Sequence, residues 1–111
     1  MDPMTDDIDL TALIENDIIS FDAVSRFPDL SLSENIQKAI GMDVPDTGIR
    51  ITEDEGELTV NCEIIVYFGE NIPQLCYDIQ SKVKRDIEEK TGLSVKAVNI
   101  RVEGLDKKEK N

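Results

Sequence analysis

The chain has 111 residues, a formal net charge of −12 and no histidine. A polyanion is repelled by nucleic acid phosphates and by anionic membrane surfaces, so the charge argues against binding to either. The lack of histidine excludes serine–histidine and cysteine–histidine catalysis within the chain. The length predicts a single domain with one modest core.

Both ends of the chain are charged and offer little to bury. Residues 1–9 predict an acidic flexible tail, residues 10–105 a single α/β domain, and residues 106–111 a charged C-terminal tail. The N-terminus is acidic where a signal peptide is basic, and no apolar stretch is long enough to span a bilayer. With two cysteines that form no disulfide framework, these features predict a cytoplasmic protein without direct membrane insertion.

Two short helices are predicted before the first strand. Residues 15–25 have a rough apolar face, and either Asn16 or Asp17 can cap it. The second helix is predicted over residues 33–41, from a serine cap to a glycine stop. Residues 42–48 contain proline and glycine and predict a loop.

A β-hairpin and a long helix follow. Apolar residues alternate over 49–52 and again over 57–67, which indicates two half-buried strands joined by the acidic turn 53–56. Apolar residues at helical spacing then predict a helix over 71–91, capped by Asn71 and ended by Gly92.

The closing strand, predicted over 93–103, changes phase. Its apolar residues alternate up to Ala97 and then continue from Val98 one step out of register. This pattern indicates a β-bulge near Ala97 and Val98, or a strand covered on both faces, for instance by a second protomer. Strand, helix and strand form a βαβ unit. The predicted fold is therefore α/β (α+β), a small mixed sheet of three to four strands with the long helix and one or two short helices on one face.

Three segments carry a resemblance to a known family. Residues 66–73 (VYFGENIP) form a strand, a glycine and an Asn-Ile-Pro corner, and residues 83–93 and 98–104 follow it. This block, within residues 48–105, resembles the alkaline-shock (envelope stress response) protein family. Residues 14–19 are similar to the family's entry into its first helix. Residues 20–28 are shorter than the family's next stretch and are broken by proline, which indicates a divergent member.

The resemblance implies a small α/β fold without catalytic activity, a tendency to self-assemble, and a link to cell-envelope homeostasis. It further implies attachment to the membrane through a separate membrane-inserted partner. The motif positions that it assigns to structure are Gly69, Asn71, Ile72, Pro73, Gly92, Asn99, Val102 and Gly104.

The residues themselves predict no catalytic, cofactor or metal site. The glycines form no phosphate-binding loop, and the acidic cluster at the hairpin tip lacks the spacing of a calcium loop, so a solvated turn is expected. Cys62 and Cys76 have no second cysteine pair with which to form a zinc site, and we expect two buried thiols.

The charge is unevenly distributed. Residues 1–70 hold 17 acidic and 3 basic residues, whereas residues 71–111 hold 7 acidic and 9 basic ones. Either this asymmetry is a solvated surface, or the basic residues pair with acidic surface of the same chain or of a neighbour. The candidate interaction residues are Lys82, Lys84, Arg85, Lys96 and Arg101.

The favoured function is a non-enzymatic scaffold or adaptor that acts through protein partners and self-association and is linked to cell-envelope stress. One alternative is an accessory or regulatory subunit of a metabolic enzyme. A second alternative, an RNA-binding βαβ module, is opposed by the negative charge and by the lack of aromatic residues on the strands.

Overall fold

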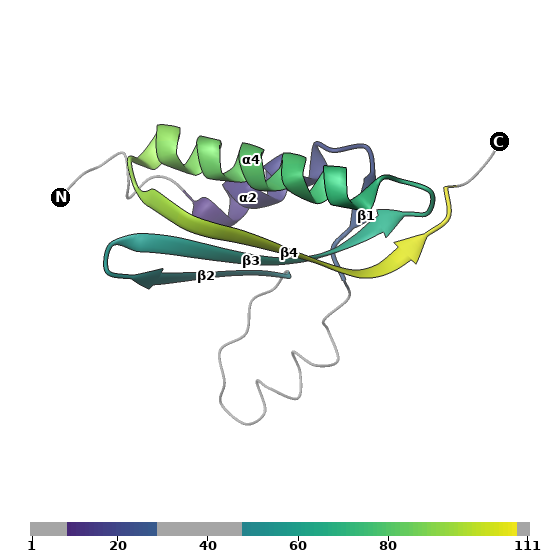
Figure 1. The fold of residues 1–111 in the computed structure, drawn as a ribbon, viewed down its shortest axis with the longest axis horizontal. Coiled ribbons are helices and arrows are strands. Elements are labelled where there is room, and N and C mark those ends of the chain that lie inside the picture. Colours follow the sequence, from purple (N-terminus) through teal and green to yellow (C-terminus); the bar gives the residue numbers. More distant parts are fainter. Residues whose placement is uncertain (1–8, 29–47, 109–111) are drawn as a thin grey trace, which may run out of the picture.

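The computed structural model describes residues 9–28 and 48–108, and within them two helices lie on one face of a four-stranded sheet (Figure 1). The predicted second helix over 33–41 and most of the loop over 42–48 lie outside the described residues. In chain order the elements are α2 (Leu10–Ile19), β1 (Val24–Arg26), β2 (Ile49–Asp54), β3 (Glu57–Tyr67), α4 (Ile72–Thr91) and β4 (Ser94–Asp106).

Strand β3 is the centre of the sheet. It pairs with β2 and β1 in antiparallel fashion and with β4 in parallel fashion, so the sheet is mixed. The predicted hairpin is confirmed, although β2 continues to Asp54 and the turn is only Glu55 and Gly56, both with positive φ. Because β4 runs parallel to β3 and α4 connects them, the predicted βαβ unit is confirmed as well.

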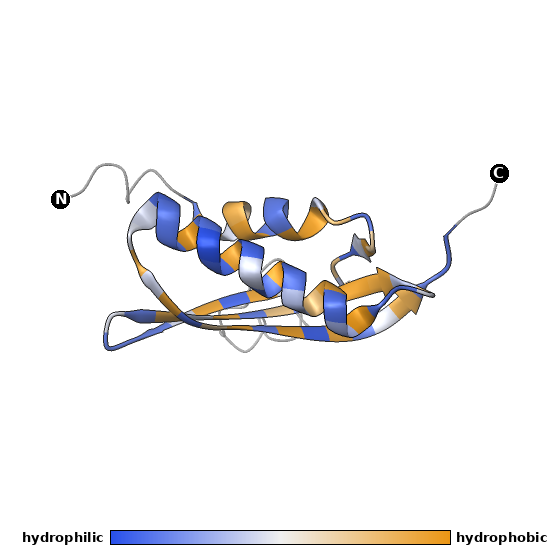
Figure 2. Cartoon of the chain, turned by 45° about the horizontal axis from the view of Figure 1, so that its top comes forward, coloured by the Kyte–Doolittle hydropathy of each residue, from blue (hydrophilic) through white to orange (hydrophobic). Residues whose placement is uncertain are grey.

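The core lies between the sheet and the two helices. Every second residue of β3 from Leu58 to Val66 is buried and faces the helices. Helix α4 presents a stripe of four buried residues at helical spacing toward this face: Leu75, Ile79, Val83 and Ile87. Figure 2 shows the same division, with hydrophobic residues of the helices turned toward the sheet and hydrophilic ones turned outward.

The predicted helix over 15–25 was wrong in its bounds. Helix α2 begins five residues earlier, because the Asp9 side chain accepts a hydrogen bond from the Ala12 amide and caps it. It ends at Ile19, and the chain then turns into β1 at Val24. Asp9, assigned by its charge to the flexible tail, is thus the N-cap residue. Helix α2 packs on α4, β1 and β2, on the face where it was expected.

Strand β4 contains the predicted bulge. Val95 lies opposite Leu58 and Ala97 opposite Thr59, so Lys96 is the extra residue, next to the predicted position. A second bulge, not predicted, leaves Glu103 as the extra residue between Val102 and Gly104. The first bulge explains the phase change, because it lets Val95 and Val98 both point into the core.

The α4 stripe generates the first prediction. Ile79 is fully buried, so Ile79→Ala should lower the free energy of unfolding by about 2–5 kcal/mol, because it removes buried methyl groups and leaves a cavity. Chemical denaturation followed by circular dichroism measures this. Tyr77→Ala is the control, since Tyr77 is exposed on the same helix. A loss below about 0.5 kcal/mol for Ile79→Ala would contradict this packing.

Candidate functional site

The corner between β3 and α4 is built by residues with special backbone roles. Gly69 adopts a positive φ of 95°, which a side chain would strain. The Asn71 side chain accepts a hydrogen bond from the Gln74 amide at 3.2 Å, and Pro73 occupies the first turn of α4, where a proline costs no hydrogen bond. Ile72 packs against the core. The turn that these residues fix holds Phe68 at the surface.

Two exposed apolar residues lie on the strand ends at this corner. Phe68 is 72% exposed and Leu105 is 52% exposed, and we call these two residues the corner patch. They belong to adjoining backbone, because the Phe68 amide donates to the carbonyl oxygen of Asp106 at 2.8 Å. Large apolar side chains with such exposure are typical of interaction surfaces when they lie together.

Charged residues around the corner patch neutralise one another. Asp106 Oδ2 accepts hydrogen bonds from Ser25 Oγ at 2.6 Å and from Arg26 Nε at 3.1 Å. The bond from Ser25 and then that from Arg26 hold the pKa of Asp106 below its usual range. Lys108 Nζ lies 5.3 Å from the Tyr67 ring centroid and 3.7 Å from Glu70 Oε2. Two acid–base pairs, Arg26 with Asp106 and Lys108 with Glu70, thus lie close in sequence to the corner patch.

The remaining motif residues have structural roles. Gly92 ends α4 in the left-handed conformation, with φ at 75°. Asn99 of β4 donates from its side chain to Asn61 Oδ1 of β3 at 2.9 Å. A Cβ at Gly104 would lie 3.2 Å from Ile65 Cδ1, so the glycine leaves room for that side chain. Val102 packs against the core.

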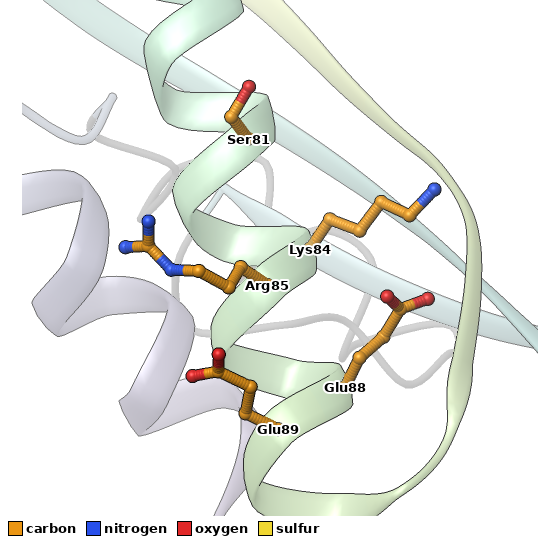
Figure 3. Close-up of a pocket in the computed structure, with 5 residues that line it drawn as sticks. All are labelled: Ser81, Lys84, Arg85, Glu88 and Glu89. Carbon is orange, nitrogen blue, oxygen red and sulfur yellow. The ribbon is translucent and has the colours of Figure 1, made fainter.

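The candidate basic residues do not form one patch. Figure 3 shows Arg85 directed toward α2 and Lys84 toward β4, on opposite sides of α4. They border an open depression of about 440 Å³ with Ser81, Glu88 and Glu89. Glu88 has a structural role, because its Oε2 accepts a hydrogen bond from the Val95 amide at the start of β4. Lys96 is a bulge residue on β4, and Arg101 is paired with Glu103. Lys82 lies near Asp17 and Asp86.

The described part of the chain offers few side chains for metal binding or for thiol chemistry. Residues 9–28 and 48–108 contain no group of three or more side chains able to hold a metal ion. Cys62 is buried and Cys76 half-buried, and both are free thiols. Neither of the two helices is long and apolar enough to cross a membrane.

Sequence reasoning missed two features. The exposure of Phe68 and Leu105 depends on how the corner packs, and their residue types alone gave no signal. Asp17 is buried at 7% exposure although it is charged. Its signal was present in the sequence, because Asp17 lies between Ile14 and Ile18 on the apolar face of α2.

The arrangement defines a small α/β domain with a mixed sheet, one covered face and an exposed apolar corner. A model of the alkaline-shock protein 23 family, described as having a cell envelope-related function, matches residues 17–107. The chain belongs to this family, and the resemblance seen in the sequence is confirmed.

Individual proteins agree with this assignment. The chain is 31% identical over 58 residues to the uncharacterized protein YloU of Bacillus subtilis, covering 52% of this chain and 48% of that protein. It is 32% identical over 54 residues to the uncharacterized protein Spy1535 of Streptococcus pyogenes, covering 49% of this chain and 42% of that protein. The matched segment thus spans about half the length of these curated relatives.

A solved structure shares the fold. The MamB CTD magnetosome protein of Desulfamplus magnetovallimortis aligns with a TM-score of 0.57 at 15% identity, covering 92% of this chain and 100% of that one. At this identity the likeness concerns the fold alone.

The two thiols generate the second prediction. Burial raises the pKa of Cys62 to about 12, so about one thiol in ten thousand is ionised at pH 8. Burial also raises the pKa of Cys76, but this residue is half-buried. Under native conditions a maleimide should therefore modify Cys76 well before Cys62, because only the thiolate reacts.

Mass spectrometry of the labelled peptides measures the two rates. Cys76→Ser should abolish the fast phase, and Cys62→Ser, the matched control, should keep it. Equal rates for both thiols in the natural chain would contradict the burial of Cys62.

Proposed function

We propose that this chain is a non-enzymatic adaptor at the cell envelope that docks a protein partner on its corner patch. The exposure of Phe68 beside Leu105 is the observation that supports it most directly. The family's cell envelope-related description supports the cellular setting. The partner that fits is a membrane-inserted protein, which would bring an acidic cytoplasmic domain to the membrane without direct insertion.

The physical reason lies in what the corner patch offers a partner. An aromatic side chain that projects from a rigid turn buries a large apolar area at a low cost in conformational entropy, and such residues dominate binding energies at interfaces. Arg26 and Lys108 neutralise Asp106 and Glu70 around it. Binding at this corner therefore avoids most of the repulsion that the net charge of −12 imposes elsewhere.

The third prediction tests the adaptor function. The tagged full chain should capture a membrane-inserted protein from detergent-solubilised extracts of the cells that produce it. Phe68→Ser should reduce capture at least about tenfold, as expected for the loss of an interface anchor. Tyr77→Ser is the matched control, because Tyr77 is also an exposed aromatic residue but lies within α4. Thermal unfolding verifies that each variant is folded.

Three outcomes would refute this proposal in different ways. Unchanged capture by Phe68→Ser would remove the corner patch from the interface. Loss of capture after nuclease treatment would favour the RNA-binding alternative. Co-purification with a single metabolic enzyme at fixed stoichiometry would favour the accessory-subunit alternative.

We further propose self-association through the outer edge of β4. Among the described strands β4 pairs only with β3, so its other edge has unpaired backbone groups. A two-fold axis at Ile100 would place Val98 opposite Val102 of a second copy, and Ile100 opposite its own counterpart. These three residues lie on the helix-covered face of the sheet. The antiparallel pairing would therefore place the helix-covered faces of the two copies on the same side of one continuous sheet. The bulges at Lys96 and Glu103 confine such pairing to residues 98–102.

The fourth prediction tests self-association. Light scattering across protein concentration should show a dimer that Ile100→Lys converts to a monomer, because two lysines would then face each other across the axis. Lys84→Glu/Arg85→Glu, on the outside of α4, is the matched control and should stay dimeric. Loss of mass in this control alone, or at high salt alone, would instead indicate charge-driven assembly. A monomeric mass at every concentration would contradict both modes.

A further inference from the structure

The side chains of Asp17 and Asp86 lie within hydrogen-bond reach of each other between the helices, where both are largely removed from water. Asp17 of α2 is 7% exposed, and the side chain of Asp86 of α4 is 14% exposed. Asp17 has fully buried neighbours on its own helix, Ile14 and Ile18, so its side chain belongs to the face with which α2 docks. Burying an ionised carboxylate is costly unless it is paired or hydrogen-bonded.

Asp17 lacks such a partner when it is ionised. Its Oδ2 is buried and has no hydrogen-bond partner among residues 9–28 and 48–108, and the ion pairs of these residues do not include Asp17. Two carboxylates cannot bond to each other without a proton, because each is only an acceptor. A proton held between Asp17 and Asp86 supplies the missing donor, as in other pairs of close carboxyl groups.

The surrounding charges do not replace that proton. Lys82 and Lys90 stand one helical turn before and after Asp86, and Arg85 Nε lies 3.6 Å from Asp86 Oδ1. All three residues are on α4, and Arg85 lowers the pKa of Asp86 without contributing to the pKa of Asp17. The other elements that α2 contacts bring no cation to Asp17. Arg26 of β1 and Arg50 of β2 are in register with Ile65 and Asn61, on the opposite face of the sheet.

We propose that Asp17 and Asp86 form a proton-dependent clasp that holds α2 on α4. One proton shared by the two carboxyl groups keeps α2 docked, and its loss leaves two negative charges facing each other in a nearly dry interface. Helix α2 has only 10 residues and is too short to be stable without its docking contacts. Loosening therefore affects α2 as a unit and uncovers Ile14 and Ile18, while the pairing of β3 with β4 persists.

The direction of the pH dependence follows from the pair. Burial, and then the hydrogen bond with Asp86, raise the pKa of Asp17 from 3.8 to about 6. The hydrogen bond from Asp17 lowers the pKa of Asp86, so Asp17 holds the shared proton. Because the pKa of Asp17 is raised in the docked state, docking weakens as the pH rises from 3.8 through about 6, and because the pKa of Asp86 is lowered, docking also weakens as the pH falls below 3.8. The full change is about a hundredfold in the docking equilibrium, of which about tenfold falls between pH 5 and pH 7.5.

The experiment uses the full chain with labelled aspartate. Carbon-13 NMR of the carboxyl groups should show Asp17 titrating near pH 6. Amide hydrogen exchange, corrected for its intrinsic pH dependence, should show α2 losing about tenfold in protection between pH 5 and pH 7.5, with β3 amides unchanged. Asp17→Asn should remove this dependence. Asp22→Asn, at an exposed aspartate just after α2, is the matched control and should retain it.

A second variant keeps the proposal testable if Asp17→Asn does not fold. In Asp86→Asn the amide can donate to an ionised Asp17, so the Asp17 titration should move toward the ordinary value. Asp17 titrating near pH 4 in the natural chain would overturn the clasp. The same loss of α2 protection in Asp17→Asn would overturn it as well, because other groups would then be responsible.

Discussion

The fold depends on the packing of one helix stripe against the sheet. Helix α4 turns Leu75, Ile79, Val83 and Ile87 toward the sheet, where it contacts β4, and β4 pairs with β3, which also pairs with the other two strands. Burial of these side chains supplies the main favourable term of a small domain. Because β3 and β4 are parallel, the chain must cross from one end of the sheet to the other, and α4 is that crossing.

The corner patch follows from this constraint. A chain that leaves β3 and enters α4 must reverse direction within a few residues, and Gly69, Asn71 and Pro73 make that turn without strain. The turn is rigid because its ends are tied to the sheet and the helix. Phe68 stands at its start, where neither layer can cover it, and the same geometry that stabilises the fold therefore exposes an aromatic side chain.

The clasp affects the docking of α2, whereas the core stabilises the whole domain. Ile14 and Ile18 supply the apolar contact of α2, and Asp17 places a titratable group between them. Replacing Asp17 by an apolar residue would strengthen docking at all pH values and would remove its control by protons. Since α2 is short and sits at the margin of the core, such control changes a local equilibrium and leaves the stability of the sheet intact.

Local periodicity and single residues such as Gly92 were enough to predict the hairpin, the long helix with its caps, the closing strand and the family. The sequence did not determine the bounds of α2, where the charge of Asp9 suggested a tail although its side chain is a helix cap. The five candidate basic residues were grouped because they carry the same charge and most of them are close in sequence. Helix geometry nevertheless directs Lys84 and Arg85 to different sides of α4. Tertiary packing brings Phe68 next to the strand end that carries Leu105 and buries Asp17 near Asp86, and the sequence could not predict either, because each pair joins segments far apart in the chain.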